Sequence, residues 1–256
     1  MRIVVKVGTS TLAHPGGRLN IRNVEELVKV LSDLKNAGHE IILVSSGAIG
    51  MGIGKLNMDR SHMDMPAKQA AAAVGQCELM HTYDTLFLKY SHTVGQILIT
   101  GEDIENPERR TNFENTMKTL LKFGALPVVN ENDTVATTEI NSVGDNDTLG
   151  AIIAKTIDAD ILILMSDIDG LFTADPNRDP DARLIETVEE ITKEIEAFAG
   201  DACSDLGTGG MATKIGAAQM VTESGCDMVI INGNYPDKLY DIVEGKSAGT
   251  LFRARR

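Results

Sequence analysis

Six short runs of apolar residues, rich in valine and isoleucine, recur along this chain of 256 residues. They cover residues 3–7, 41–44, 94–99, 126–129, 161–165 and 228–231. Continuous apolar runs of this length are typical of strands buried on both faces, as in a parallel sheet. Patterns with helical spacing lie between them, at residues 24–34, 66–88, 114–123, 148–157, 188–198, 211–223 and 236–244. This alternation predicts an α/β protein with an open, mostly parallel sheet covered by helices.

The size and charge of the chain narrow its function further. Its length suits one large α/β domain or two small ones. A formal net charge of −13 argues against broad contact with nucleic acid or a membrane surface, so a phosphate site would have to be built locally. The cysteines, Cys77, Cys203 and Cys226, form no Cys-x-x-Cys pair and indicate neither disulfides nor zinc. No apolar run has the length of a signal peptide or membrane span, and we expect a soluble, cytoplasmic protein.

Polar or glycine-rich residues follow four of the predicted strands. They are Gly8-Thr9-Ser10, Ser45-Ser46-Gly47, Asn130-Glu131-Asn132-Asp133 and Ser166-Asp167. Ligands of open α/β sheets bind beyond the carboxyl ends of the strands. A glycine after a strand is often a simple turn, but four such ends at one sheet edge favour a binding site.

Lys6 stands inside the first apolar run, between Val5 and Val7. Lysine is almost never buried without a partner. One interpretation is an edge-strand lysine whose ammonium group reaches water. The other is a lysine that points at a phosphate from the end of the sheet, where Gly8 lets the phosphate approach the backbone.

A glycine-rich segment, Gly207-Thr208-Gly209-Gly210, precedes a predicted helix that begins Met211-Ala212-Thr213-Lys214. Free N–H groups at a helix N-terminus favour an anion. The segment is not a P-loop, because its spacing differs and no strand leads into it. The alternative is a flexible glycine turn, which Thr213 and Lys214 make the weaker interpretation.

An acidic cluster, Gly144-Asp145-Asn146-Asp147, precedes another predicted helix. Asp and Asn are common helix N-caps, which would explain any one of these residues. Two acids around an amide, together with the acids of Asn130-Glu131-Asn132-Asp133, exceed what capping requires. Such a cluster can hold an ammonium group, a metal ion or lysine side chains.

No nucleophile paired with a base, such as Ser–His or Cys–His, is evident in the sequence. Phosphoryl transfer needs alignment and neutralised charge rather than covalent help from the protein. A carboxylate acceptor is already ionised at pH 7 and needs no general base. The residues therefore agree with a kinase that phosphorylates a carboxylate.

These motifs resemble the glutamate 5-kinase family of the amino acid kinases, from Arg2 to Phe252. The Asn-Glu-Asn-Asp, Gly-Asp-Asn-Asp and Gly-Thr-Gly-Gly-Met motifs are the specific ones, whereas the Asp-Gly-Leu-Phe-Thr-Ala-Asp-Pro stretch at 169–176 is shared more widely. The resemblance implies a single domain over residues 1–256, a three-layer αβα sandwich with a mainly parallel sheet of roughly eight strands. It also implies MgATP as donor, L-glutamate as acceptor and L-glutamyl 5-phosphate as product, the first step of proline biosynthesis.

When the functional residues of the family are transferred to the matching positions of this chain, the resemblance implies roles for three groups of residues. Lys6 and Lys214 flank the transferring phosphoryl group, and Asp147 holds both lysines in place. Ser46, Asp133 and Asn146 contact glutamate. No residue is assigned to a resident metal ion, because Mg²⁺ arrives with the nucleotide. The implied ATP site consists of Lys6, Ser166, Asp167, Thr208, Gly209, Gly210, Met211, Ala212, Thr213 and Lys214.

Some features depart from the family pattern or concern partners. Ser166 stands where threonine is more usual, and Asn141-Ser142 lengthens the loop before Gly144. We expect the chain to lack the C-terminal PUA-type domain, of the kind found in RNA-modifying enzymes, that many members carry. We also expect a homo-oligomer (dimer or tetramer), feedback inhibition by L-proline, and hand-over of the product to glutamyl phosphate reductase.

Two alternatives stay open. The first is another member of the superfamily, such as N-acetylglutamate kinase, aspartokinase or uridylate kinase. An acid at Asp133 suits a free α-ammonium group and argues against it. The second is a non-catalytic ligand sensor on the same fold, and the presence of Lys6, Asp147 and Lys214 argues against that.

Overall fold

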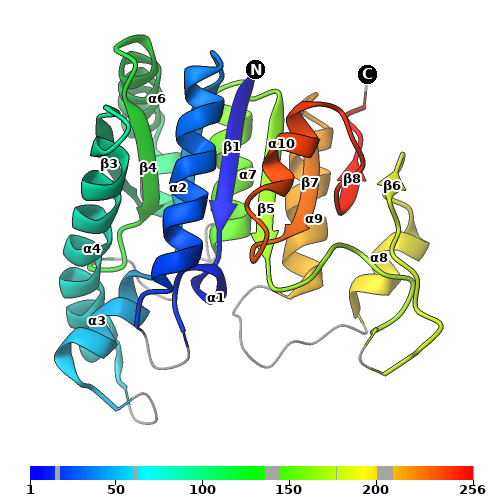
Figure 1. Ribbon diagram of the computed structural model, residues 1–256, viewed down its shortest axis with the longest axis horizontal. Coiled ribbons are helices and arrows are strands. Elements are labelled where there is room, and N and C mark those ends of the chain that lie inside the picture. The colour runs from blue at the N-terminus through cyan, green and yellow to red at the C-terminus, as the bar shows by residue number, and fades with distance from the viewer. Residues whose placement is uncertain (15–17, 60–62, 136–144, 177, 201–209, 256) are drawn as a thin grey trace.

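The strands of this protein form one eight-stranded sheet in the order β3-β4-β2-β1-β5-β7-β8-β6 (Figure 1). A computed structural model describes residues 1–256 apart from 15–17, 60–62, 136–144, 177, 201–209 and 256. Of the pairings between these strands, only β7 with β8 is antiparallel. The strands are β1 Arg2–Val7, β2 Glu40–Ser45, β3 Val94–Ile99, β4 Leu126–Glu131, β5 Ile161–Ser166, β6 Thr187–Val188, β7 Asp227–Asn232 and β8 Thr250–Phe252.

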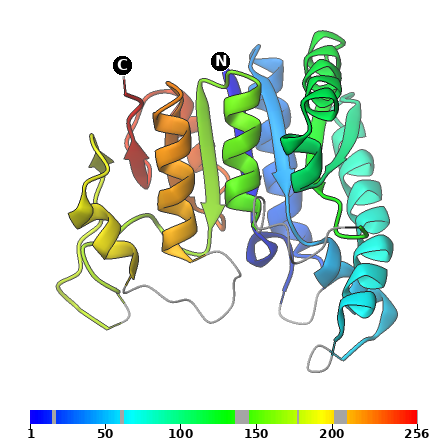
Figure 2. The ribbon, with the colours of Figure 1, turned by 180° about the vertical axis from the view of Figure 1, so that it is seen from behind.

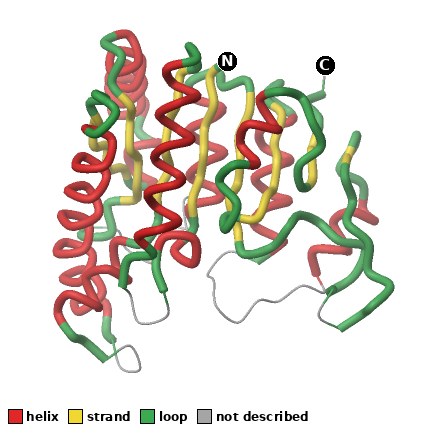
Figure 3. The backbone as a smooth tube through the Cα atoms, viewed as in Figure 1, coloured by secondary structure: helices red, strands yellow, loops and turns green. Residues whose placement is uncertain are grey.

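Helices cover both faces of the sheet, so the predicted αβα sandwich is confirmed. In Figure 3 the strands lie between the two helical layers. α2, α4 and α10 cover one face, and α6, α7 and α9 cover the other (Figures 1 and 2). None of the described helices is long and apolar enough to cross a membrane. The helices are α1 Thr9–Leu12, α2 Ile21–Asn36, α3 Ala48–Leu56, α4 Met65–Leu88, α5 Gly101–Glu105, α6 Pro107–Lys122, α7 Asn146–Thr156, α8 Lys193–Gly200, α9 Met211–Thr222 and α10 Lys238–Val243.

Side chains of β1 alternate between two hydrophobic cores. Ile3, Val5 and Val7 belong to the core shared with α2, α4 and α10, whereas Val4 belongs to the core under α7 and α9. Because strand side chains point to opposite faces in turn, Lys6 shares the face of Val4. β1 is flanked by β2 and β5 in the interior of the sheet, so the edge-strand interpretation of Lys6 is wrong.

All six predicted strands are present, but some helix boundaries differ from the prediction. α6 already begins at Pro107, where the Asn106 side chain accepts N–H bonds from Glu108 and Arg109. The helix predicted at 188–198 begins only at Lys193, because Thr187–Val188 forms the short strand β6 beside β8. β6, β8 and the short helices α1, α3 and α5 were not predicted.

α3 and α4 approach each other backbone to backbone. A Cβ atom added at Gly75 would lie 1.7 Å from the carbonyl oxygen of Ala48, and one at Gly52 would lie 1.8 Å from that of Ala71. Only glycine permits so close an approach. The contact therefore fixes the start of α3, just after β2, against the middle of α4.

Gly75→Ala should lower the free energy of unfolding by about 3 kcal/mol, the upper end for an overpacked core, because backbone atoms cannot move aside cheaply. Gly216→Ala in α9 is the matched control, since that position is exposed and an added Cβ meets nothing within 4 Å. The control should gain about 0.5–1 kcal/mol from helix propensity. Urea denaturation measures both, and a Gly75→Ala protein as stable as the wild type would contradict the backbone contact.

Candidate active site

Four neighbouring parallel strands, β4, β2, β1 and β5, end at one edge of the sheet. The polar ends that follow them are therefore brought together, as predicted. Val7 pairs with Ser45 and with Met165, and Ser46 N–H donates to the Val7 carbonyl oxygen at 3.0 Å. α1 and α3 lie at this edge, beyond the arrowhead of β1 in Figure 1.

Asp147 lies between two buried lysines on the face covered by α7 and α9. Lys6 Nζ is 2.6 Å from Asp147 Oδ1, and Lys214 Nζ is 3.0 Å from Oδ2. The exposed fractions are 8% for Lys6, 1% for Asp147 and 5% for Lys214. The three residues come from β1 and from the first turns of α7 and α9, which lie side by side in Figure 2. The structure thus brings together all three residues predicted to be catalytic.

The charges of this cluster do not cancel. Burial disfavours an ionised carboxyl, but the two ammonium groups outweigh it and hold the pKa of Asp147 below its ordinary value. Among the described residues, two ammonium groups face one carboxylate, so these three side chains together carry one net positive charge. A Cβ at Gly8 would lie 3.8 Å from Lys6 Nζ, so the bare backbone of Gly8 lets an anion approach that side of the ammonium group.

Capping explains only one of the two acids at the start of α7. Asp145 is the N-cap, and its Oδ1 accepts the N–H groups of Asp147 at 2.7 Å and Thr148 at 3.0 Å. Asp147 makes no such cap and turns its carboxylate to the lysines instead. Asp145 therefore fixes the first turn of α7, and through it the position of Asp147.

Side-chain amides connect this cluster to neighbouring elements. Asn146 Nδ2 donates to Ser46 Oγ at 2.6 Å and to Asn130 Oδ1 at 3.2 Å. Asn130 Nδ2 in turn donates to Gln76 Oε1 at 2.9 Å. The predicted pair Ser46 and Asn146 is thus in contact. The sequence analysis named Asn130 only as part of the polar segment 130–133 and gave it no role of its own, and it did not name Gln76, which lies in the middle of an alanine-rich helix.

A cavity of about 410 Å³ begins where this network ends. Ala48, Ala72 and Gln76 line it from the helices, and Glu131 and Asp133 line it from the end of β4. Burial raises the pKa of Asp133 to about 6. Burial, and then the charges of Asp133 and Asp145, raise that of Glu131 to about 7. A cation in this cavity would favour the ionised form of both acids, so the cavity suits an ammonium group.

The described residues that were predicted to bind ATP, apart from Lys6, lie at the end of β5 and the start of α9. Ser166 ends β5, and its hydroxyl donates to Asp167 Oδ1 at 3.0 Å. Gly210 is the N-cap residue of α9 and its carbonyl oxygen accepts from Thr213 Oγ1 at 2.8 Å. Met211 is buried and Ala212 is exposed in the same turn. Thr208 and Gly209 lie outside the described residues.

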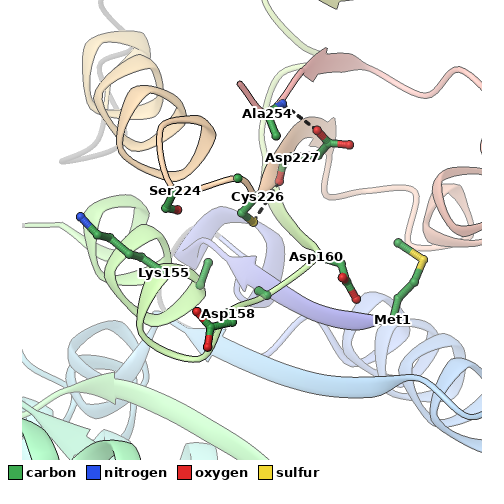
Figure 4. A pocket seen from close by; sticks show the side chains of 11 residues that line it. Met1, Lys155, Asp158, Asp160, Ser224, Cys226, Asp227 and Ala254 are labelled. Atoms are coloured by element: carbon green, nitrogen blue, oxygen red, sulfur yellow. Dashed lines mark hydrogen bonds between the residues drawn. The ribbon is translucent and has the colours of Figure 1, made fainter. Parts of the chain in front are cut away.

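Another cavity, of about 610 Å³, lies at the opposite edge of the sheet (Figure 4). Two of its three acids bind backbone near the chain ends, since Asp160 Oδ2 accepts Arg2 N–H at 2.6 Å and Asp227 Oδ1 accepts Ala254 N–H at 2.7 Å. Burial raises the pKa of the Cys226 thiol there to about 12. Because ligands of such sheets bind at the carboxyl ends of strands, this cavity is not the candidate site.

Comparison with known proteins agrees with this geometry. The model of the amino acid kinase family matches residues 1–232. A glutamate 5-kinase of Clostridium tetani is 54% identical over 252 residues, which cover 98% of this chain and 94% of that protein. A glutamate 5-kinase of Clostridium perfringens is 48% identical over 258 residues, covering 100% and 96%.

Solved structures with low sequence identity share the fold. The carbamate kinase from Giardia lamblia bound to AMP-PNP matches with a TM-score of 0.70 at 15% identity, over 98% of both chains. The UMP kinase from Ureaplasma parvum matches with a TM-score of 0.63 at 14% identity, also over 98% of both chains.

The family model and the fold agree, and the chain belongs to the amino acid kinase family. Within that class, the curated relatives described above, which match nearly the whole chain, are glutamate 5-kinases.

Glu131→Gln should stabilise the protein at pH 8 and progressively less below pH 7. Because the pKa of Glu131 is raised to about 7 in the folded protein, its ionisation destabilises the fold in full above about pH 7. This destabilisation disappears as the pH falls toward 4.5, the ordinary pKa of the group. Melting temperatures measured between pH 5 and 8 test this, with exposed Glu190→Gln as the control. A difference between Glu131→Gln and wild type that does not vary with pH would contradict burial of an ionised Glu131.

Proposed function

We propose that this chain transfers the γ-phosphoryl group of ATP to the side-chain carboxylate of L-glutamate. The products are ADP and L-glutamyl 5-phosphate, in the first step of proline biosynthesis, and residues 1–256 form the catalytic unit. The observation that carries the chemistry is the buried Lys6–Asp147–Lys214 cluster with its excess positive charge. The glutamate 5-kinases that match nearly the whole chain support the choice of acceptor.

In this proposal Lys6 and Lys214 flank the transferring phosphoryl group. They neutralise the charge on its oxygens, while Asp147 keeps both ammonium groups in fixed positions. A glutamate side chain is ionised at pH 7, so no residue has to remove a proton from it.

The nucleotide lies against the start of α9 and the end of β5, where Thr213, Ser166 and Asp167 meet it. The excess positive charge beside them fits the phosphates of ATP. Mg²⁺ bound to ATP supplies further neutralising charge on those phosphates. Among the described residues, no group of three or more His, Cys, Asp or Glu is placed to hold a metal ion, and arrival of Mg²⁺ with the nucleotide stays a prediction.

The acceptor lies between the lysine cluster and the acidic cavity. Asn146 directly precedes Asp147, bonds to Ser46, and is linked through Asn130 to Gln76 at the cavity. Asp133 in the cavity takes the α-ammonium group of glutamate. The side-chain carboxylate then reaches past Ser46 and Asn146 toward the lysines.

An assay of acyl phosphate formation tests the reaction. With MgATP, the protein should release ADP only when L-glutamate is present, and added hydroxylamine should trap the product as the hydroxamate. Turnover of N-acetylglutamate, aspartate or uridylate in place of glutamate would support another member of the family. Binding of ATP and glutamate without turnover would support the non-catalytic sensor.

Lys6→Ala and Lys214→Ala should each lower kcat about 10²–10³-fold, the usual loss for one group that stabilises transition-state charge. Steady-state kinetics measures this, and circular dichroism checks that each variant is folded. Lys29→Ala is the control, since that lysine is exposed and paired with Glu26 on the surface. Near-normal kcat in Lys214→Ala would remove it from the catalytic residues.

Asp133→Ala should raise the KM for glutamate strongly and leave the KM for ATP unchanged. A charge-assisted hydrogen bond contributes roughly 1.5–3 kcal/mol, and N-acetylation removes the charge that makes it. Wild-type kcat/KM should therefore be about 10²-fold lower for N-acetylglutamate than for glutamate. Equal values for the two substrates would contradict the role of Asp133.

The partners stay predictions. They are assembly as a dimer or tetramer, inhibition by L-proline, and hand-over of the product to glutamyl phosphate reductase in the cytoplasm. Proline would share the glutamate cavity and the loop that follows Thr134, most of which, residues 136–144, lies outside the described residues. Competition with glutamate at unchanged maximal rate is the expected form of the inhibition.

A further inference from the structure

Gln76, which lines the acidic cavity, carries an unpaired hydrogen-bond donor. The residue lies in α4 and is only 8% exposed. Its Oε1 accepts from Asn130, but its Nε2 has no partner among the described residues. Leaving a buried donor unpaired costs roughly 1–3 kcal/mol, and such groups are rare enough in folded proteins to require an explanation.

The surroundings of Gln76 indicate which kind of ligand would accept a hydrogen bond from its Nε2. Its side chain lines the cavity of about 410 Å³ together with Glu131 and Asp133. These acids suit an ammonium group, but in the structure neither accepts the N–H groups of Gln76. A ligand that fills the cavity and brings both an ammonium group and its own acceptor oxygen would satisfy both features. An α-amino acid carries these two groups on one carbon atom.

The position of Gln76 is fixed from two sides. Gly75, the preceding residue, packs against the Ala48 carbonyl oxygen with no room for a side chain. Asn130 holds the Oε1 end of the amide and leaves Nε2 without a partner among the described residues. A donor fixed before the ligand arrives loses little entropy on binding.

We propose that Gln76 determines specificity by donating a hydrogen bond from Nε2 to the α-carboxylate of the acceptor amino acid, while Asp133 takes the α-ammonium group. This inference rests on the proposed function. The two contacts hold the α-carbon in the cavity, and the side-chain carboxylate extends past Ser46 and Asn146 to the lysines. The acceptor is thereby limited to amino acids with both α-groups free.

The test compares L-glutamate with its α-amide, L-isoglutamine, in which an N–H donor replaces one carboxylate oxygen. Wild-type kcat/KM should be at least about 10-fold lower for the α-amide. Gln76→Glu keeps the shape of the side chain but replaces the NH₂ donor by an oxygen. It should lower kcat/KM for glutamate about 10–10²-fold and leave kcat/KM for the α-amide unchanged or higher. Gln76→Met removes the donor without adding charge and should cost glutamate more than the α-amide.

Gln219→Glu is the matched control, because Gln219 is exposed on α9 and does not line the cavity. It should leave the ratio of the two kcat/KM values near that of the wild type. The KM for ATP should stay unchanged in all variants, and thermal unfolding measures whether each is folded.

The outcomes separate this inference from the proposed function. Without glutamate-dependent ADP release by the wild type, the proposed function fails. If the wild type uses glutamate and its α-amide equally well, the Gln76 contact is wrong, whatever the variants do. A fall in kcat/KM that is the same for both substrates in the Gln76 variants would make Gln76 a structural residue and overturn the inference.

Discussion

The Asp147 carboxylate makes it possible to keep two ammonium groups inside this protein. A buried ammonium group without a partner would cost several kcal/mol, and Lys6 stands on a central strand of the sheet. Asp147 offsets this cost for Lys6 and Lys214 at once. The same carboxylate therefore joins β1, α7 and α9, and it links the packing of this face of the sheet to the charge of the candidate site.

Local rules of strand and helix geometry place the members of this cluster. The alternation of side chains along β1 turns Lys6 to the face of α7 and α9. The cap at Asp145 starts α7 at the point where Asp147 meets that lysine. Gly150 in α7 packs closely on the lysine stem, where an added Cβ would lie 3.4 Å from Lys6 Cβ.

Much of this arrangement could be predicted from the sequence, because its signals are local. The apolar runs predicted the six long strands, and the polar residues after them predicted the edge where the site lies. The pairing of Lys6 and Lys214 with Asp147 came from family resemblance, since residues so far apart in sequence leave no periodic signal. Gln76 was missed, and Asn130 was named only within a polar segment, because their pairing depends on a contact between α4 and β4. β6 and β8 were missed because two or three residues are too few to give a pattern.

The glycine contact between α3 and α4 limits how this protein can change its acceptor. Ala48 and Gln76 line one side of the cavity, next to the contact in which Gly52 and Gly75 bring the backbones of α3 and α4 together. Gly52 and Gly75 therefore cannot accept larger side chains unless the two helices move apart. A chain of this kind that adapts to a longer or shorter amino acid has to change the side chains that line the cavity, such as Ala72, Met80 and Leu98.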